Sequence, residues 1–322
     1  MTFPISICVP TYNRCTYLNE LIESIVCDPN YSQIELCISD NASADGTAEM
    51  VAGWADQLTV RYHRFDENQG ADANYLNVVS MATGDYVWII GSDDQVVDGG
   101  ISTVLAHLTA HPNTGVVLFG RDEYDHSMTQ FLNRTHWVGQ PRYHLDIFDF
   151  RLPESRTAYF RQVSELGGLF SYISSIVIKR ELWQTQVIDP QFMGTAYSHV
   201  YMILKGLLCS SHSLLFLSPE VPIKARLGND SFFQTNCQRL MLDIDGYLLL
   251  ATALIPAEER SAFYSPLRSE GYLDYLNNTL RAYYPTFSGE DLRKIITVCG
   301  WAAVRKCTGP ALKIGLRSLL TR

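Results

Sequence analysis

"YVWIIGSDD", residues 86 to 94, is a run of aromatic and β-branched residues that ends in a glycine, a serine and two adjacent aspartates. Such an apolar run predicts a buried strand over 85–90. Asp93 and Asp94 follow it directly. Neighbouring carboxylates repel each other unless a cation or water lies between them. The cation could be a metal ion or a lysine, or there could be none, and the rest of the sequence has to decide.

Strand and helix signals alternate around this run and predict a largely parallel α/β sheet. The expected strands are 5–10, 34–40, 58–65, 85–90 and 114–121. The expected helices are 16–26, 44–56, 71–82 and 99–111. In the first of these helices the apolar residues recur at helical spacing, namely Leu18, Leu21, Ile22, Ile25 and Val26. Residues 172–183 return to a strand and then a helix.

Two later regions differ from this pattern. From 122 to 165 the signals loosen into a polar and aromatic stretch, and a connection of that length is usually functional or mobile. From about 235 onward the signals are helical. We therefore expect an α/β nucleotide-binding-type domain followed by a helical C-terminal part.

The composition narrows the class of protein. With 322 residues, 47% hydrophobic and 18% charged, the chain can bury a sizeable core. A net charge of −9 argues against a general nucleic-acid binder. The eight cysteines contain no CxxC pair, which disfavours a zinc ribbon or a thioredoxin-type site. No signal peptide and no apolar stretch of the ~18 residues needed to span a bilayer is found, so we expect a cytoplasmic protein with reduced thiols.

Polar residues follow three of the predicted strands. They occupy 10–14, 40–43 and 92–94. Ligands of open α/β sheets bind in the crevice at the carboxyl ends of the strands, so these loops are expected to converge. Each loop alone has a simpler interpretation as an ordinary turn. Their coincidence favours a binding site.

The kind of ligand is narrowed by exclusion. No GxGxxG follows the first strand, which disfavours a Rossmann dinucleotide site, and no P-loop GxxxxGK[ST] is present. Adjacent carboxylates bind phosphate poorly, but they can hold Mg²⁺ or Mn²⁺, which then bridges phosphate oxygens. Asp93 and Asp94 suit such a hard cation better than any soft metal.

Three segments together resemble the GT-A domain of family 2 glycosyltransferases over about residues 4 to 120. They are "ISICVPTYNR" (5–14), "ISDNASADGT" (38–47) and "NQGADANYLNVVSMATGDYVWIIGSDD" (68–94). The resemblance implies a nucleotide-sugar donor whose diphosphate is held through Mn²⁺ or Mg²⁺ at Asp93 and Asp94. It places the donor against Pro10, Thr11, Tyr12, Arg14, Asp40, Asn68, Asn74, Ser92 and Asp93. The implied domains are 1–234 for donor and acceptor and 235–322 as a helical region.

The chain departs from the family pattern at two places. Gly91 stands where the first acid of the usual D-x-D motif is found, and the acid expected as catalytic base near 192–208 is absent. His199 stands closest to that slot, and it is interpreted as a catalytic base or a third metal ligand beside Asp94, or as a core histidine. Asp189 and Glu123 are weaker candidates for the base.

Two further residues near the predicted cleft have open interpretations. Arg226 is a candidate clamp for the diphosphate or a solvated surface arginine. Asp72 either faces the cleft with Asn74 or caps its own helix.

"GSDD" after "YVWII", with a histidine in the base region, is similar to the abequosyl-type deoxyhexosyltransferases of bacterial O-antigen synthesis. That similarity implies a CDP- or dTDP-linked deoxysugar donor and a polyprenyl-diphosphate-linked oligosaccharide acceptor. Aromatic residues between 122 and 165 would suit the acceptor or are simply buried: Tyr124, Phe131, Trp137, Tyr143 and Phe148. The basic, apolar segment 309–322 is read either as a docked helix or as a peripheral contact with the inner face of the cytoplasmic membrane.

Two other functions compete with glycosyl transfer. A sugar nucleotidyltransferase would share the α/β fold, but a Gly-rich basic loop is expected after its first strand, and "PTYNR" is not one. A catalytically silent carbohydrate- or nucleotide-binding module fits the two missing acids. It predicts nucleotide-sugar binding without metal dependence or turnover.

Overall fold

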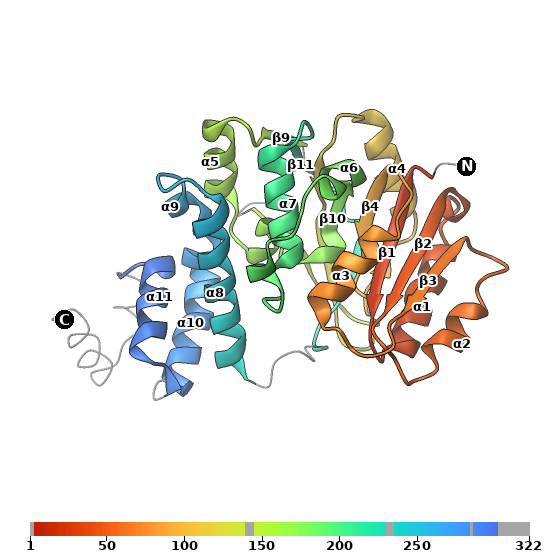
Figure 1. Cartoon of the computed structure of the whole chain (residues 1–322), viewed down its shortest axis with the longest axis horizontal. Helices are drawn as coiled ribbons and strands as arrows, with labels where there is room; N and C mark the ends of the chain where they lie inside the picture. Colours follow the sequence, from red (N-terminus) through yellow and green to blue (C-terminus); the bar gives the residue numbers. More distant parts are fainter. Residues whose placement is uncertain (1–2, 139–144, 230–234, 284–285, 302–322) are drawn as a thin grey trace. The chain divides into compact units, whose positions relative to one another are not determined.

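The computed structural model describes residues 3–138, 145–229, 235–283 and 286–301 (Figure 1). The chain forms two compact units. The first comprises Met1–Arg156 and Phe170–Asn229, and the second comprises Thr157–Leu169 and Asp230–Arg322, as far as each is described.

The main sheet of the first unit has eight strands in the order β3-β2-β1-β4-β10-β6-β11-β9. Their bounds are β1 (Ile5–Thr11), β2 (Ile34–Asp40), β3 (Val60–Arg64), β4 (Tyr86–Ile89), β6 (Val116–Leu118), β9 (Asp146–Asp149), β10 (Ile176–Lys179) and β11 (Leu214–Leu217). The first four are parallel, whereas β10 runs antiparallel to both of its neighbours and β9 runs antiparallel to β11. The prediction of a mixed, mostly parallel α/β sheet is confirmed.

The strand register brings the carboxyl ends of three strands to one edge of this sheet. Thr11 of β1 lies opposite Asp40 of β2, and Cys8 lies opposite Ile89 of β4. The ladder extends one residue further, because the backbone N–H of Ile90 donates to the carbonyl of Cys8 at 2.9 Å. The chain segments that follow β1, β2 and β4 therefore start side by side.

Helices pack on the sheet because their apolar faces match it. The helices of the first unit are α1 (Cys15–Val26), α2 (Thr47–Ala52), α3 (Ala71–Ser80), α4 (Gly100–Ala110), α6 (Arg180–Gln184) and α7 (Ser198–Cys209), with α5 (Pro153–Gln162) ending in the second unit. Short 3-10 helices are η1 (Tyr31–Gln33), η3 (Ile173–Ser175) and η4 (Pro190–Phe192). In α1 the predicted face is buried at Leu18, Leu21, Ile22 and Ile25. Burial of each such side chain stabilises the fold by about 1.5–3 kcal/mol.

A smaller sheet forms where the sequence had indicated an irregular stretch. Its order is β5-β12-β7-β8, with β5 (Gln95–Val96), β7 (Arg121–Tyr124), β8 (Phe131–Thr135) and β12 (Ile223–Arg226). Polar cross-strand pairs stabilise it: Asp122 lies opposite Arg134, and their side chains form an ion pair at 2.6 Å. The expectation of a loose segment over 122–165 was wrong because polar strands carry no apolar alternation.

The second unit is helical, and it includes Thr157–Leu169 besides the C-terminal residues. Its elements are α8 (Asn236–Leu254), α9 (Arg260–Phe263), α10 (Glu270–Tyr283), α11 (Gly289–Cys299), η2 (Leu166–Leu169) and η5 (Pro266–Arg268). Helices α10 and α11 both pack on α8 (Figure 1). Within the described residues no helix has the length and apolar character needed to cross a membrane. The basic segment 309–322 lies outside the described residues.

Candidate active site

The two aspartates that follow β4 turn back over Gly91. A Cβ on Gly91 would lie 3.1 Å from Oδ1 of Asp93 and 3.3 Å from Oδ2 of Asp94. The turn is closed by the N–H of Asp94, which donates to the carbonyl of Gly91 at 3.0 Å. Both carboxylates therefore converge on space that any larger residue at position 91 would fill. This explains physically why a glycine stands here.

Asp94 is 5% exposed and is held by three donors. Its Oδ2 accepts from the hydroxyls of Tyr172 at 2.6 Å and Ser174 at 2.5 Å, and its Oδ1 accepts from the backbone N–H of Arg226 at 3.1 Å. Burial, followed by the charge of Asp93, raises the pKa of Asp94 to about 6. Two charged groups forced together in this way form a site that favours a cation.

Arg14 supplies a cation beside the pair. Its Nη1 lies 2.8 Å from Oδ2 of Asp93, and the same oxygen accepts from Nδ2 of Asn229 at 2.8 Å. Within the described part of the chain, no donor reaches Oδ1 of Asp93 within hydrogen-bonding distance. That free oxygen is the one that faces Gly91.

The arrangement fits a hard divalent cation. One oxygen from each aspartate borders the same space, and Mg²⁺ is typically bound by one or two carboxylates together with substrate phosphates and water. Among the described residues no three His, Cys, Asp or Glu side chains converge on a metal position. The interpretation of His199 as a third ligand is therefore not supported by this arrangement.

At the ends of β1 and β2 an aromatic ring is exposed beside a buried acid. Tyr12 is 45% exposed, whereas Asp40 is fully buried. Asp40 accepts from the hydroxyl of Tyr62 at 2.6 Å and from the backbone N–H of Ser43 at 2.8 Å. The carboxylate thus shapes the loop, and the Tyr12 ring is open to a planar ligand. Pro10, on β1, is partly buried.

Two buried oxygen atoms without partners lie at the same edge. The amide of Asn74 donates to the carbonyl of Thr11 at 3.2 Å. Asn74 Oδ1 and Thr11 Oγ1 are themselves buried and have no hydrogen-bond partner among the described residues. Buried polar atoms normally find one, so these two oxygen atoms are candidate acceptors for a water molecule or a ligand hydroxyl. Ser92, in the turn after β4, is buried at 3% exposure.

Asn68 is positioned by a residue that the sequence had suggested only as a turn former. Asn41 donates to Oδ1 of Asn68 at 2.8 Å and to the carbonyl of Gly70 at 3.3 Å, and it accepts from the N–H of Gln69 at 2.8 Å. Asn41 therefore joins the loop after β2 to the loop before α3. Its position directly after a strand-ending acid was the available signal.

Arg226 is buried and contacts several segments, so it is not a solvated surface arginine. At 8% exposure its guanidinium donates to the carbonyl of Asp93 at 2.9 Å, to the carbonyl of His126 and to the carboxylate of Glu20. It also lies over the ring of Tyr17, 4.6 Å from the centroid. These contacts join β12, α1 and the acid pair. Its role as a diphosphate clamp stays a prediction.

His199 is the second residue of α7 and is 4% exposed. Its Nε2 lies 3.1 Å from the carbonyl of Phe170. A carbonyl can only accept, so Nε2 carries the proton in the neutral ring and Nδ1 carries a lone pair. Nδ1 is buried and has no partner among the described residues. Burial lowers the pKa of His199 to about 4, which keeps the ring neutral at pH 7.

The other candidate bases are engaged elsewhere. Asp189 caps η4 by accepting from the N–H of Gln191 at 3.1 Å, and Glu123 pairs with Arg121 at 2.6 Å. Asp72 does not cap its own helix: the N-cap of α3 is Gly70, and the Asp72 carboxylate instead binds the start of α7. The interpretation of Asp72 as a cap of α3 was therefore wrong.

The aromatic residues proposed for the acceptor divide into two groups. Trp137 and Phe148 are buried at 1% and 7% exposure, so they are core residues in this structure. Phe131 is 51% exposed and meets Tyr124 edge-on, with ring centroids 5.8 Å apart. Tyr143 lies outside the described residues.

Ser174 of η3 also holds the turn that carries Asp93 and Asp94, and the sequence analysis did not connect η3 with the site. Ser174 donates to Asp94 through its hydroxyl, and that hydroxyl accepts from the N–H of Gly91 at 2.9 Å. Its carbonyl accepts from the indole N–H of Trp88 at 2.8 Å. Nothing in the local sequence around Ser174 indicated this role, since the contact depends on β10 lying beside β4.

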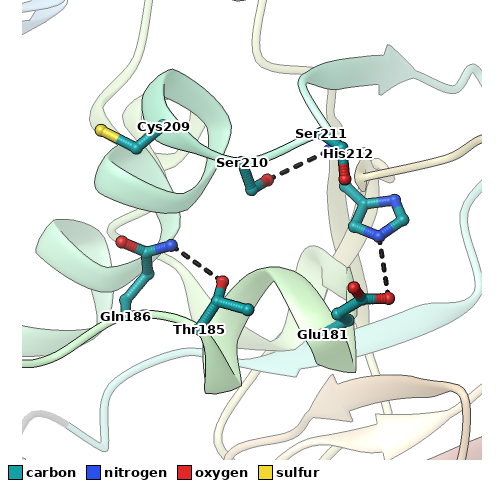
Figure 2. A pocket seen from close by; sticks show the side chains of 7 residues that line it. All are labelled: Glu181, Thr185, Gln186, Cys209, Ser210, Ser211 and His212. Atoms are coloured by element: carbon teal, nitrogen blue, oxygen red, sulfur yellow. Dashed lines mark hydrogen bonds and ion pairs between the residues drawn. The ribbon is translucent and has the colours of Figure 1, made fainter.

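A separate pocket of about 330 Å³ lies at the other end of α7, and Figure 2 shows its polar lining. Glu181 and His212 pair across it at 3.1 Å. Along a helix of this length the pocket and His199 are separated by about 15 Å. None of the predicted site residues lines this pocket.

The fold is that of GT-A glycosyltransferases, as a comparison with solved structures shows. TarS 1–349 of Staphylococcus aureus, crystallised with UDP, has a TM-score of 0.60 with 14% identity and covers 94% of this chain and 82% of its own. Mannosyltransferase PcManGT from Pyrobaculum calidifontis, in complex with GDP-Man and Mn²⁺, has a TM-score of 0.57 with 16% identity, covering 100% and 86%. At these identities the likeness shows the fold alone.

The chain belongs to glycosyl transferase family 2, whose model matches residues 6–171. Abequosyltransferase RfbV of Salmonella typhimurium is 35% identical over 252 residues, which cover 77% of this chain and 74% of that enzyme. The GalNAc(5)-diNAcBac-PP-undecaprenol beta-1,3-glucosyltransferase of Campylobacter jejuni is 31% identical over 104 residues, 31% of this chain and 33% of that enzyme. The resemblance drawn from the sequence motifs is confirmed.

Proposed function

We propose that this glycosyltransferase moves a deoxyhexose from a nucleotide-diphosphate sugar of the CDP-abequose type to a lipid-linked oligosaccharide in surface polysaccharide synthesis. The observation that carries the proposal is the convergence of Asp93 and Asp94 over Gly91, beside Arg14. The relatives support the finer assignment, because one is named an abequosyltransferase and another is named for an undecaprenol-diphosphate-linked acceptor.

In this proposal residues 1–234 bind donor and acceptor, and residues 235–322 form a helical region. The basic segment 309–322 provides a peripheral contact with the cytoplasmic face of the membrane, where a lipid-linked acceptor is presented. An anionic lipid surface attracts lysine and arginine, and seven basic residues with no acid follow Asp291.

The donor is placed along the carboxyl edge of the sheet. Its base stacks on Tyr12, and its ribose lies toward Asp40. Its sugar lies near the two partnerless oxygen atoms of Thr11 and Asn74, which can accept from sugar hydroxyls. Asn68, Ser92 and Pro10 complete the binding surface in this assignment.

A divalent cation, Mn²⁺ or Mg²⁺, would be held by Asp93 and Asp94 and would supply charge neutralisation for the leaving diphosphate. The protein itself contributes Arg14, whose Nη1 lies 2.8 Å from Oδ2 of Asp93 and places a positive charge beside the diphosphate position. Arg226 fixes the loop that presents the acid pair.

His199 is the proposed acceptor of the proton from the attacking hydroxyl, through Nδ1. The tautomer suits this role, because Nε2–H donates to the carbonyl of Phe170 and leaves the lone pair on Nδ1. The complex with bound substrates must differ from this structure in two ways. Nδ1 has to become accessible to the acceptor, and a nearby diphosphate charge has to raise the depressed pKa of the imidazole.

The test is calorimetric titration of CDP, UDP, GDP and dTDP with and without Mn²⁺. We expect one nucleotide to bind tightly only with Mn²⁺, and we expect Asp93→Asn and Asp94→Asn to abolish that binding. Asp125→Asn is the matched control, since Asp125 is an acid on the β7–β8 turn outside the site. Metal-independent binding that ignores both aspartates would contradict the metal site and favour the binding module. Release of CDP from CDP-abequose then tests turnover.

A further inference from the structure

The turn that leads into α7 is strained. Ala196 has a φ of 62°, in the left-handed region that alanine rarely adopts. The next residue, Tyr197, is the N-cap of α7, and its side chain makes no capping hydrogen bond. Strain of this kind persists only where the surroundings enforce it, and it gathers at functional sites.

The missing cap is supplied from another helix. Asp72, in the first turn of α3, is 4% exposed. Its Oδ2 accepts from the N–H of Ala196 at 3.0 Å. Its Oδ1 accepts from the N–H of Ser198 at 3.3 Å and from the Ser198 hydroxyl at 2.6 Å. One buried carboxylate thus satisfies the open backbone donors and places a negative charge at the positive end of α7.

The ring of His199 is held by the same helix. Tyr75, one turn after Asp72 on α3, contacts the imidazole edge-on with centroids 5.4 Å apart. The opposite constraint is the carbonyl of Phe170, another residue with a left-handed φ, of 67°. The position of Nδ1 therefore depends on how α3 grips the start of α7.

We propose that Asp72 is a positioning residue: it fixes the first turn of α7 and with it the ring of His199, whose Nδ1 reaches the acceptor once the bound complex has exposed it. The inference rests on the proposed function, in which His199 takes the acceptor proton. Asp72 touches no reacting atom, so its removal lowers the turnover rate while donor binding is retained.

The chain contains a matched control. Asp28 is 1% exposed and caps α4 from outside that helix, accepting from the N–H of Ile101 at 2.9 Å and from the N–H and hydroxyl of Ser102 at 3.3 and 3.0 Å. Asp28 thus caps α4 in the same way as Asp72 caps α7, but α4 carries no residue of the candidate site. Asp28→Asn therefore reports what the loss of a buried cap does to the fold alone.

The first experiment compares the kinetics of CDP release from CDP-abequose by Asp72→Asn, Ser198→Ala and Asp28→Asn. We expect kcat to fall at least tenfold in Asp72→Asn and a few-fold in Ser198→Ala, with the donor KM within twofold of wild type. Asp28→Asn is expected to lower the Tm to a similar extent while its kcat stays within twofold. An unchanged kcat in Asp72→Asn, or an equal loss in Asp28→Asn, would overturn the proposal.

The second experiment needs no turnover. Long-range ¹H–¹⁵N spectra of the full chain report the histidine tautomers, and His199→Gln assigns the signal. We expect the Nε2-protonated form in the wild type and in Asp28→Asn, and a shifted or mixed form in Asp72→Asn. If the wild type fails to consume CDP-abequose, the proposed function fails, and this spectrum still decides the role of Asp72. An unmoved His199 signal in Asp72→Asn would refute it.

Discussion

Two buried acids stand at opposite edges of the same sheet and are treated in opposite ways. Glu35, near the amino end of β2, is fully buried and accepts from Ser6 at 2.5 Å and from Arg61 at 2.8 Å, besides Thr83 and Gly84. Asp94, at the carboxyl edge, has a second carboxylate as its neighbour. The charge of Glu35 is compensated by its hydrogen-bond donors and by Arg61, whereas the paired charges of Asp93 and Asp94 favour a bound cation.

The pKa values express the same difference. Burial alone would raise the pKa of Glu35, but hydrogen bonds from Ser6, Thr83 and Arg61 outweigh burial and hold it below its usual value. For Asp94, burial and the charge of Asp93 prevail over its three donors, and the pKa rises to about 6. A buried acid with every donor it needs is structural, whereas one beside a like charge indicates a site.

The largest effect is expected from Asp94→Asn. If the acid pair binds the cation that neutralises the leaving diphosphate, turnover falls at least hundredfold, which corresponds to about 3 kcal/mol of transition-state stabilisation. Steady-state release of nucleotide diphosphate measures it. Turnover within threefold of wild type in Asp94→Asn would show that the pair is not the catalytic centre.

The converse change is Glu35→Gln. Removing the charge leaves donors of Ser6, Thr83 and Arg61 poorly satisfied, so the free energy of unfolding at pH 7 should fall by about 2–4 kcal/mol. Urea titration gives this value, with the exposed Glu258→Gln as control. The kcat of the folded enzyme should be unchanged. A fall in kcat comparable to that of Asp94→Asn would contradict the purely structural role of Glu35.

The two acids also predict opposite responses to pH. The native pKa of Asp94 is above its usual value, so its contribution to stability declines as pH rises from about 4 through about 6. The pKa of Glu35 is lowered, so its contribution is present above pH 4.5 and is lost as pH falls through its native pKa. Melting curves should therefore show the Tm of Asp94→Asn gaining on the wild type between pH 4 and pH 7. The Tm of Glu35→Gln should instead gain on that of the wild type as pH falls below 4.5, where the wild type loses the Glu35 contribution, and a constant difference in either window would contradict the corresponding assignment.

The smallest effect is expected from Tyr172→Phe. It removes one of the three donors to Asp94 and keeps the aromatic ring under Arg121, whose guanidinium lies 4.1 Å from the centroid. Loss of one such bond is worth about 1 kcal/mol. We expect a few-fold change in the affinity for the metal-bound nucleotide, measured by calorimetry. A loss as large as that in Asp94→Asn would mean that Tyr172 itself contacts the ligand.

Much of the first hundred residues could be predicted because each strand and helix has a clear period. The strand at 34–40 was placed at its observed bounds, and four of the five residues predicted for the α1 face are buried, Val26 being only partly so. The polar sheet could not be predicted, since β7 and β8 are stabilised by polar cross-strand pairs such as Asp122 with Arg134 and show no apolar alternation.

The site was predictable only where function follows directly after a strand. Asp93, Asp94, Arg14 and Tyr12 were named as candidates in that way, because they follow β4 and β1. Ser174, Tyr172 and Asn229 reach the acid pair from distant segments, and no local signal connects Ser174 or Tyr172 with it. Asp72 was considered as a cap of its own helix, whereas it binds the start of α7, and that contact depends on the packing of α3 against α7.

The hydrogen bond between the indole of Trp88 and the carbonyl of Ser174 has a practical consequence. Trp88 is fully buried on β4, and the same serine binds Asp94 through its hydroxyl. A ligand that binds Asp94 should alter the polarity around the indole of Trp88. The fluorescence of Trp88 should therefore report occupancy of the site without any label. The signal is isolated by comparison with Trp88→Phe, and it would let donor and metal binding be followed in real time.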